Sequence, residues 1–257
     1  MHKLISVITI NFNHLEGLKN TFHSIVSQTD RSRLEWIVVD GNSTDGSADF
    51  LNQNAGNFDV LVIESDKGIY DAMNKGLQLA TAPYVWFMNS GDTMHSEDSA
   101  SAAIRIIENK QPDVIYSDTM FVTPEMMEIG RISELKPQPF PKKLTFGSFR
   151  FGMNICHQSF IVKKAITTSY NLTYKQAADV DWIIQILKKN PSNSISPTLL
   201  SNFEVGGSSY QHTKKAWRER FDVLTKHYGL LPNLLAHVWI IIRRVFFNLK
   251  LKMNKGQ

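Results

Sequence analysis

Apolar positions follow two different periods along the first half of the chain, and their alternation predicts strands that are each followed by a helix. Short β-rich runs recur, and after each run the apolar residues return every three or four positions. The expected strands are 4–10, 34–40, 59–64, 83–88 and 113–116, and the expected helices are 16–28, 43–52, 70–80 and 96–109. This order indicates βαβ units, and therefore an α/β fold with a mainly parallel sheet and helices on both faces.

The second half is less regular. Residues 120–143 mix short β-prone pieces with Pro124, Pro137, Pro139 and Pro141, a pattern that favours loops. We expect a strand at 157–162, a helix at 178–189 and extended chain at 195–203. From residue 211 the pattern becomes helical to the end of the chain, which predicts a C-terminal helical extension of the α/β domain.

The amino-acid composition indicates an ordinary globular protein. The chain has 257 residues, 42% of them hydrophobic and 20% charged, which is typical of a globular domain with a substantial core. Its one cysteine, Cys156, can form no intramolecular disulfide and no paired-cysteine zinc site; we expect it to be buried. We find no export signal, because the first apolar run is short and lacks a cleavage site, so a cytoplasmic location is expected.

Positive charge is concentrated in the tail. Residues 211–257 hold ten Lys or Arg and two acidic residues, whereas the whole chain has a net charge of only +4, so residues 1–210 are net acidic. A basic end favours an anionic partner, with a membrane surface preferred over nucleic acid. A nucleic-acid-binding module would explain the tail alone, so we expect no nucleic-acid partner.

Polar clusters follow four of the predicted strands. Each cluster alone is typical of a turn or a helix cap. In a parallel sheet, however, the carboxyl ends of the strands meet at one edge, where ligands bind. The clusters are Asn11-Phe12-Asn13, Asp40-Gly41-Asn42-Ser43-Thr44-Asp45-Gly46, Asp66-Lys67-Gly68 and Asn89-Ser90-Gly91-Asp92.

These four clusters, in this order, resemble the family 2 glycosyltransferases of the GT-A fold. Two later segments also match, Cys156-His157-Gln158-Ser159 and Ala177-Ala178-Asp179-Val180-Asp181-Trp182, so the resemblance extends over residues 4–205. The residues of the third and fourth clusters are most similar to those of enzymes of capsule, colanic acid and O-antigen synthesis. The resemblance implies a Rossmann-like nucleotide-binding sheet. Residues 1–118 would bind the nucleotide sugar, 119–210 the acceptor, and 211–257 would form a separate tail.

The implied activity is the transfer of a sugar, with inversion, from a UDP- or GDP-sugar to a hydroxyl of a glycan. This acceptor glycan would be linked to polyprenyl diphosphate. A non-catalytic nucleotide-sugar-binding scaffold is the alternative. A sugar nucleotidyltransferase is disfavoured, since no Gly-rich basic loop follows the first strand.

The resemblance also assigns the donor side. Asp40 would accept hydrogen bonds from the nucleobase, Phe12 would stack on it and Asn11 would read its edge. Phe12 as a core aromatic and Lys67 as a solvated lysine are equally open alternatives. The implied donor-binding residues are Asn11, Phe12, Asp40, Lys67, Asn89, Ser90 and Gly91.

A divalent cation, Mn²⁺ or Mg²⁺, is the implied cofactor, because the diphosphate leaving group gains negative charge. The family's acidic metal motif falls on residues 89–92, and here Asp92 alone keeps a carboxylate, with Asn89 a neutral oxygen donor. Magnesium and manganese can bind through few protein ligands beside substrate phosphates. A metal-independent site that relies on cationic side chains is the alternative.

Asp179 is the implied general base, at the start of a predicted helix. A helix cap is its alternative role, and Asp181 is the rival base, although it should point to a different face. His157 and Gln158, on the preceding strand, would contact the diphosphate or the acceptor; a structural histidine is equally compatible.

The tail segment 230–252 predicts a basic amphipathic helix. His237, Arg243, Arg244 and Asn248 interrupt it too often for a convincing transmembrane span. Such a helix can lie in the headgroup region of an anionic membrane, so we expect a peripheral protein on the inner face of the cytoplasmic membrane. A helix docked on the catalytic domain or on another subunit is the alternative.

Overall fold

The centre of the molecule is a seven-stranded sheet with the order β10-β6-β9-β4-β1-β2-β3. The computed structural model describes residues 2–206 and 213–254. Strands β3, β2, β1 and β4 are parallel, whereas β9 runs antiparallel between β4 and β6. The predicted mainly parallel sheet is therefore confirmed. The strands are β1 (Ile5–Asn11), β2 (Leu34–Asp40), β3 (Val60–Ile63), β4 (Tyr84–Phe87), β6 (Val114–Tyr116), β9 (Phe160–Lys163) and β10 (Asn193–Ile195).

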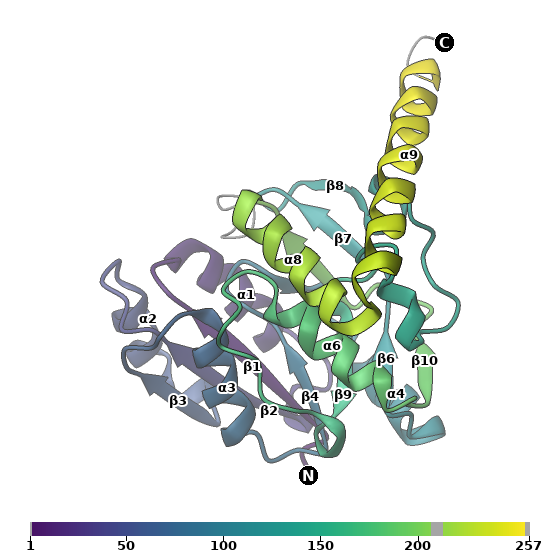
Figure 1. Cartoon of the computed structure of the whole chain (residues 1–257). Helices are drawn as coiled ribbons and strands as arrows, with labels where there is room; N and C mark the ends of the chain where they lie inside the picture. The colour runs from purple at the N-terminus through teal and green to yellow at the C-terminus, as the bar shows by residue number, and fades with distance from the viewer. Residues whose placement is uncertain (1, 207–212, 255–257) are drawn as a thin grey trace.

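Helices cover both faces of this sheet, because successive side chains of a strand point to opposite sides. Ile8 and Ile10 of β1 pack into one core with α3 (Ile69–Leu79) and α6 (Ala178–Lys188). Ile5 and Val7 pack into a second core with α1 (Leu15–Val26) and α4 (Ser99–Lys110). A short helix, α2 (Ser47–Gln53), follows β2. Figure 1 shows the two layers of helices around the twisted sheet.

A second, four-stranded sheet has the order β5-β11-β7-β8. It consists of β5 (Thr93–Met94), β11 (Ser201–Glu204), β7 (Thr119–Val122) and β8 (Glu128–Arg131), and α5 (Ile132–Leu135) follows β8. The prediction of loops over 120–143 was therefore wrong for 120–122 and 128–131, which form strands. The prolines lie outside the strands, and β7 obtains its pairing from β11, about 80 residues later in the chain.

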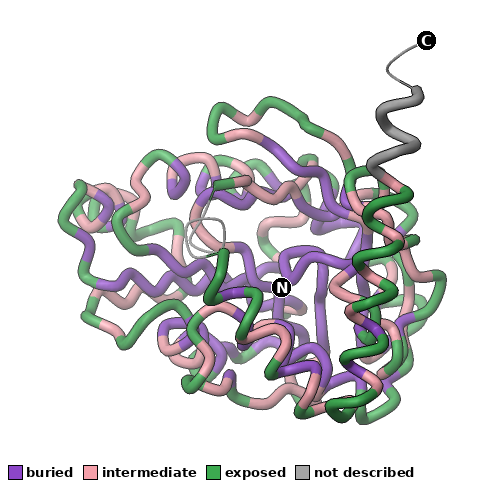
Figure 2. Tube along the Cα trace, turned by 45° about the horizontal axis from the view of Figure 1, so that its top comes forward, coloured by how far each residue is buried: buried purple, intermediate pink, exposed green. Residues whose placement is uncertain are grey.

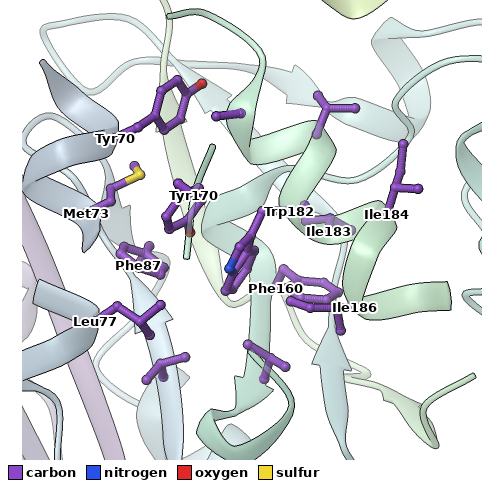
Figure 3. Packing of buried hydrophobic residues seen from close by; sticks show 14 of the residues in the cluster. Tyr70, Met73, Leu77, Phe87, Phe160, Tyr170, Trp182, Ile183, Ile184 and Ile186 are labelled. Carbon is purple, nitrogen blue, oxygen red and sulfur yellow. The ribbon is translucent and has the colours of Figure 1, made fainter. Parts of the chain in front are cut away.

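The first core centres on an aromatic cluster (Figure 3). Trp182 of α6 stacks on Tyr170 at a ring-centroid distance of 4.9 Å, and Phe87 of β4 meets Trp182 edge-on at 5.8 Å. The Trp182 indole N–H donates to the carbonyl oxygen of Thr168 at 2.6 Å, so the ring is fixed in orientation. This packing fixes the first turn of α6, and with it Asp179, relative to the sheet.

The predicted helical tail forms two helices, α8 (Thr213–Tyr228) and α9 (Leu230–Asn254). α8 packs on α6, where Lys226 and His227 both contact the Asp181 carboxylate, at 3.1 and 2.7 Å. α9 projects away from the body (Figure 1), and its outer surface is exposed along most of its described length (Figure 2). Its attachment includes Asn233, which donates to the carbonyl oxygen of Phe221, and Arg243, which donates to that of Phe151.

We predict that Gly76→Ala destabilises the protein. Gly76 of α3 lies against β1, where an added Cβ would come within 2.4 Å of Ile8 Cγ2. Overpacking of this kind costs about 1–3 kcal/mol, which exceeds the gain in helix propensity. Urea unfolding measures the loss. Gly56→Ala is the matched control, since nothing lies within 4 Å of a Cβ there. Equal stability of the two variants would contradict the close packing of α3 on β1.

Candidate functional site

The carboxyl ends of β1, β2 and β4 are joined by one side chain, Asn11. Asn11 lies opposite Asp40 in the parallel register of β1 and β2. Its amide nitrogen donates to Asp40 Oδ2 at 2.6 Å, and its amide oxygen accepts from the Ser90 hydroxyl at 2.6 Å. The structure thus brings together the first, second and fourth polar clusters of the sequence.

Asp40 is fully buried at this junction. Its carboxylate accepts from the Ser43 N–H at 2.8 Å and from the Ser43 hydroxyl at 2.7 Å, in addition to Asn11. These bonds fix the turn after β2. The role of Asp40 in binding the nucleobase stays a prediction. Asp40 itself does not face solvent, whereas the neighbouring Phe12 does.

Phe12 is 64% exposed, so the open alternative of a core aromatic is excluded by its position. A Cβ placed at Gly41 would lie 2.9 Å from the Phe12 ring and 2.8 Å from Asp66 Oδ2, so the aromatic face and this carboxylate are neighbours. Asp66 was not among the predicted donor residues, although it begins the third polar cluster. Lys67 beside it is exposed, and its N–H donates to Asp71 Oδ2 at 3.0 Å.

Asp92 is the buried last residue of the loop that follows β4. Its carboxylate accepts from Gln158 Nε2 at 2.7 Å and from the Glu204 N–H at 3.2 Å. Burial raises the pKa of Asp92 to about 8. Two residues that the sequence did not indicate lie beside it: Glu204, at the end of β11, and His14, whose Nε2 lies 3.3 Å from Glu204 Oε1. The hydrogen bond to Glu204 raises the pKa of His14.

The oxygen donors of the loop 89–92 fit a divalent cation whose other ligands would come from a diphosphate. Among the described residues, no group of three or more His, Cys, Asp or Glu forms a complete metal site. However, Asn89 Oδ1 is buried with no hydrogen-bond partner in the described part of the chain, and Asp92 adds a carboxylate nearby. Hard cations such as Mg²⁺ take oxygen ligands and often keep only one or two from protein carboxylates.

Asp179 lies in the first turn of α6 and is partly exposed. The Tyr70 hydroxyl donates to Asp179 Oδ1 at 2.9 Å. Burial, and then the charge of Asp179, hold the pKa of Tyr70 well above its usual value, so this phenol remains a donor. Tyr70 was missed as a site residue, although it lies in the first turn of α3, two residues after the Asp66-Lys67-Gly68 cluster.

Asp181 is fully buried on the other side of α6 and accepts hydrogen bonds from Gln185 as well as from His227. The structure therefore excludes it as the rival base and gives it a role in attaching α8. The two residues are separated by about 200° around the helix, which is why one faces the site and the other faces α8.

The sequence predicted that His157 and Gln158 lie on a strand. They instead form a 3₁₀ turn before β9. Both are buried. His157 Nε2 lies 2.7 Å from the Tyr170 hydroxyl, and burial lowers the pKa of His157 to about 4. The imidazole is therefore neutral at pH 7, so it offers no positive charge to a diphosphate. Their contact with diphosphate or acceptor stays a prediction.

The arrangement agrees with a match to a known family. The sequence model of the family described as glycosyl transferase family 2 matches residues 6–167 of the chain. The chain belongs to this family. It is therefore a glycosyltransferase, an enzyme that takes its sugar from a nucleotide sugar, and the family predicted from the sequence is confirmed.

Two bacterial relatives match over nearly the whole chain. An uncharacterised glycosyltransferase of Mycobacterium tuberculosis is 31% identical over 242 residues, which cover 92% of this chain and 89% of the relative. A PGL/p-HBAD biosynthesis glycosyltransferase of Mycobacterium bovis is 28% identical over 246 residues, 92% and 91% of the two chains.

Two solved structures share the fold. Residues 1–349 of S. aureus TarS, in complex with UDP, match with a TM-score of 0.66 and 16% identity, over 87% of this chain and 65% of that one. A mannosyltransferase of Pyrobaculum calidifontis, in complex with GDP-Man and Mn²⁺, matches with a TM-score of 0.65 and 16% identity, over 96% of this chain and 74% of that one. At such identity these matches show the fold, and the predicted GT-A architecture is confirmed.

We predict that His157 makes stability depend on acid pH. Its folded pKa of about 4 lies below the value of about 6.5 in an unfolded chain. Its contribution to the free energy of unfolding is therefore complete above pH 6.5 and is lost, by up to about 3 kcal/mol, as the pH falls to 4. Urea unfolding between pH 7 and 4 should show a shallower decline for His157→Gln than for the wild type. The same substitution at the exposed His23 is the control, and parallel curves for His157→Gln and wild type would refute the assignment.

Proposed function

We propose that this glycosyltransferase inverts the anomeric centre as it moves a sugar from a UDP- or GDP-sugar to a hydroxyl of a lipid-linked glycan in bacterial cell-surface synthesis. The observation that carries the proposal is the Asp179 carboxylate, which is partly exposed and held by Tyr70 next to the donor clusters. The name of the M. bovis relative places that protein in PGL/p-HBAD biosynthesis, which supports a surface glycolipid as the class of product.

The position of Asp179 suits a general base. Tyr70, which orients it, follows Lys67 by three residues, and Lys175, shortly before α6, reaches the carbonyl oxygen of Lys67 at 3.4 Å. These contacts hold the base beside the donor-binding loop. Asp179 would accept the proton of the acceptor hydroxyl while that oxygen forms its bond to the anomeric carbon and the bond from this carbon to the diphosphate breaks. Attack opposite the leaving group gives inversion.

The nucleotide would lie at the carboxyl edge of β1 and β2. The exposed ring of Phe12 offers a stacking surface, and Asp66 beside it offers a carboxylate for the imide or amine of a base. Asn11 and Asp40 would fix the two loops that carry these groups. A divalent cation held by Asp92 and Asn89 would offset the charge that develops on the diphosphate.

We predict that Asp179→Asn lowers transfer about 100- to 10,000-fold while nucleotide binding is retained, because it removes a base and no binding group. Thermal shift with UDP and GDP, each with and without Mn²⁺, measures binding, since a ligand of the native state raises the Tm. Transfer of labelled sugar to a glycolipid extract measures activity. Tyr70→Phe, which keeps the ring and removes the donor, should give an intermediate loss.

Two outcomes would contradict this assignment in different ways. Wild-type turnover by Asp179→Asn would show that Asp179 only caps α6. Binding of a nucleotide without transfer by the wild type, to any glycolipid fraction, would favour the non-catalytic scaffold.

The exposed side of α9 is the proposed membrane contact. Its apolar residues span roughly half of the helix circumference at 100° per residue, a surface we call the α9 stripe. The stripe consists of Leu231, Leu234, Leu235, Val238, Trp239, Ile241, Ile242, Val245 and Phe246, all exposed. On the opposite side Asn233 and Ala236 are buried against the body.

The charge of the surrounding tail favours an anionic leaflet as the partner of the α9 stripe, because ten of the chain's basic residues lie in 211–257. The expectation that this segment is too interrupted to span a membrane needs correction on one point. The window Leu230–Phe247 has a mean hydropathy of 1.5 and is 11% buried, so its length and composition suffice for a span. We nevertheless propose a peripheral contact on the cytoplasmic face, because Arg243 is tied to the body through Phe151 and Gln138.

We predict that the protein co-sediments with vesicles that contain phosphatidylglycerol. The double variant Trp239→Ala/Phe246→Ala should lower the partition coefficient by at least about 100-fold, since each large apolar side chain that is buried contributes about 1.5–3 kcal/mol. Trp217→Ala is the matched control, because Trp217 of α8 is also exposed but lies outside the stripe. Release by carbonate would support a peripheral contact, and retention would support a span. If the protein does not co-sediment with vesicles and elutes as a dimer in size-exclusion chromatography, the stripe contacts a second copy of the chain instead.

A further inference from the structure

A carboxylate from a distant strand lies against the loop that holds the metal motif. Of residues 89–92, Asp92 alone is acidic, and Gly91 has no side chain. Glu204, which follows Asp92 by 112 residues, fills this space. A Cβ built on Gly91 would lie 2.8 Å from Glu204 Oε2 and 3.0 Å from its carboxyl carbon. The carboxylate of Glu204 therefore occupies the volume that a side chain at position 91 would need.

The small sheet fixes Glu204 in this place. β11 pairs antiparallel with β5, which begins directly after Asp92, and Asn202 lies opposite Thr93 in that register. Asn202 Nδ2 donates to the Thr93 hydroxyl at 2.9 Å, and the Glu204 N–H donates to Asp92 Oδ1 at 3.2 Å. The loop 89–92 and the end of β11 therefore form one rigid unit. Gly91 completes it, because its φ of +95° is strained for any residue with a Cβ.

The Glu204 carboxylate is largely enclosed, and His14 is a basic neighbour on one side of it. The Glu204 side chain is only 10% exposed, and the buried carboxylate of Asp92 lies beside it. Glu204 Oε1 faces His14 Nε2 at 3.3 Å, whereas Oε2 lies over Gly91. Asn89 Oδ1 on the same loop is buried without a partner in the part of the chain that the structure describes. Carboxylate and amide oxygens are the ligand types that hard divalent cations prefer.

We propose that Glu204 is a ligand of the divalent cation, and that it replaces from β11 the carboxylate that the motif at 89–92 has lost. The inference rests on the proposed donor site, since the diphosphate and water would complete the coordination. The described residues supply too few ligands for a closed cage, so cation binding should depend on the nucleotide. His14 would move from Glu204 Oε1 or share that carboxylate with the cation.

The test is a Mn²⁺ titration followed by electron paramagnetic resonance, with and without saturating UDP or GDP. The wild type should bind Mn²⁺ at least tenfold more tightly when the nucleotide is present. Glu204→Gln keeps the shape of the side chain and should raise the Kd for Mn²⁺ at least tenfold in the presence of the nucleotide. Glu128→Gln, at an exposed position of β8 in the same small sheet, should bind Mn²⁺ as the wild type does.

Measurements in EDTA separate this result from misfolding. Glu204→Gln should keep a Tm close to that of the wild type and should bind the metal-free nucleotide with unchanged affinity. Unchanged Mn²⁺ affinity in Glu204→Gln would overturn the proposal, as would a wild type that binds nucleotide but no Mn²⁺. In either case the transferase function would stand. A wild type that binds no nucleotide at all would overturn the donor site and the cation ligand together.

Discussion

The site depends on a single amide, the side chain of Asn11. Three loops emerge from the carboxyl edge of a parallel sheet, and such loops have no backbone ladder to hold them together. Asn11 supplies the connection, since its nitrogen binds Asp40 after β2 and its oxygen binds Ser90 after β4. A buried amide can donate and accept at once, which is why an asparagine suits this position. Phe12 directly follows it, so the same bonds determine where the exposed ring lies.

The acceptor side is held to this edge by packing. Trp182, Tyr170 and Phe87 form a continuous aromatic contact between α6 and β4. Asp181 adds an electrostatic connection to the tail, because its fully buried carboxylate meets Lys226 and His227 of α8. A buried carboxylate must be paired or hydrogen-bonded, so this connection also limits how α8 can pack. The position of Asp179 is therefore determined by interactions on the opposite side of its own helix.

Several polar groups near the site are buried at a cost in stability. His157 is held neutral, Asp92 is enclosed beside Glu204, and Asn89 Oδ1 has no partner among the described residues. Such groups usually reduce stability unless they are compensated. Their concentration around the loop 89–92 is consistent with a site that is completed by a charged ligand, because perturbed groups collect where binding or catalysis requires them.

The sequence by itself determined the α/β alternation, the parallel sheet and the family, since hydrophobic periodicity and the order of the polar clusters are local properties of the chain. It also placed Asp179 at a helix start and found the helical tail. Only the tertiary structure showed that Asp40 is buried and that Phe12 is open, because exposure depends on what the neighbouring loops cover. It assigned Asp179 and Asp181 to opposite sides of α6, and it formed β7 and β8 from a segment whose prolines predicted loops.

Glu204 is the clearest case of this difference. It belongs to no polar cluster, and nothing near it in the sequence points to Gly91. Its contact with the loop 89–92 arises because β11 pairs with β5, and a pairing between segments about 110 residues apart leaves no local pattern to read. Local propensities and motif order define the elements and the chemistry of the site, whereas strand pairing and side-chain packing decide which of its residues meet.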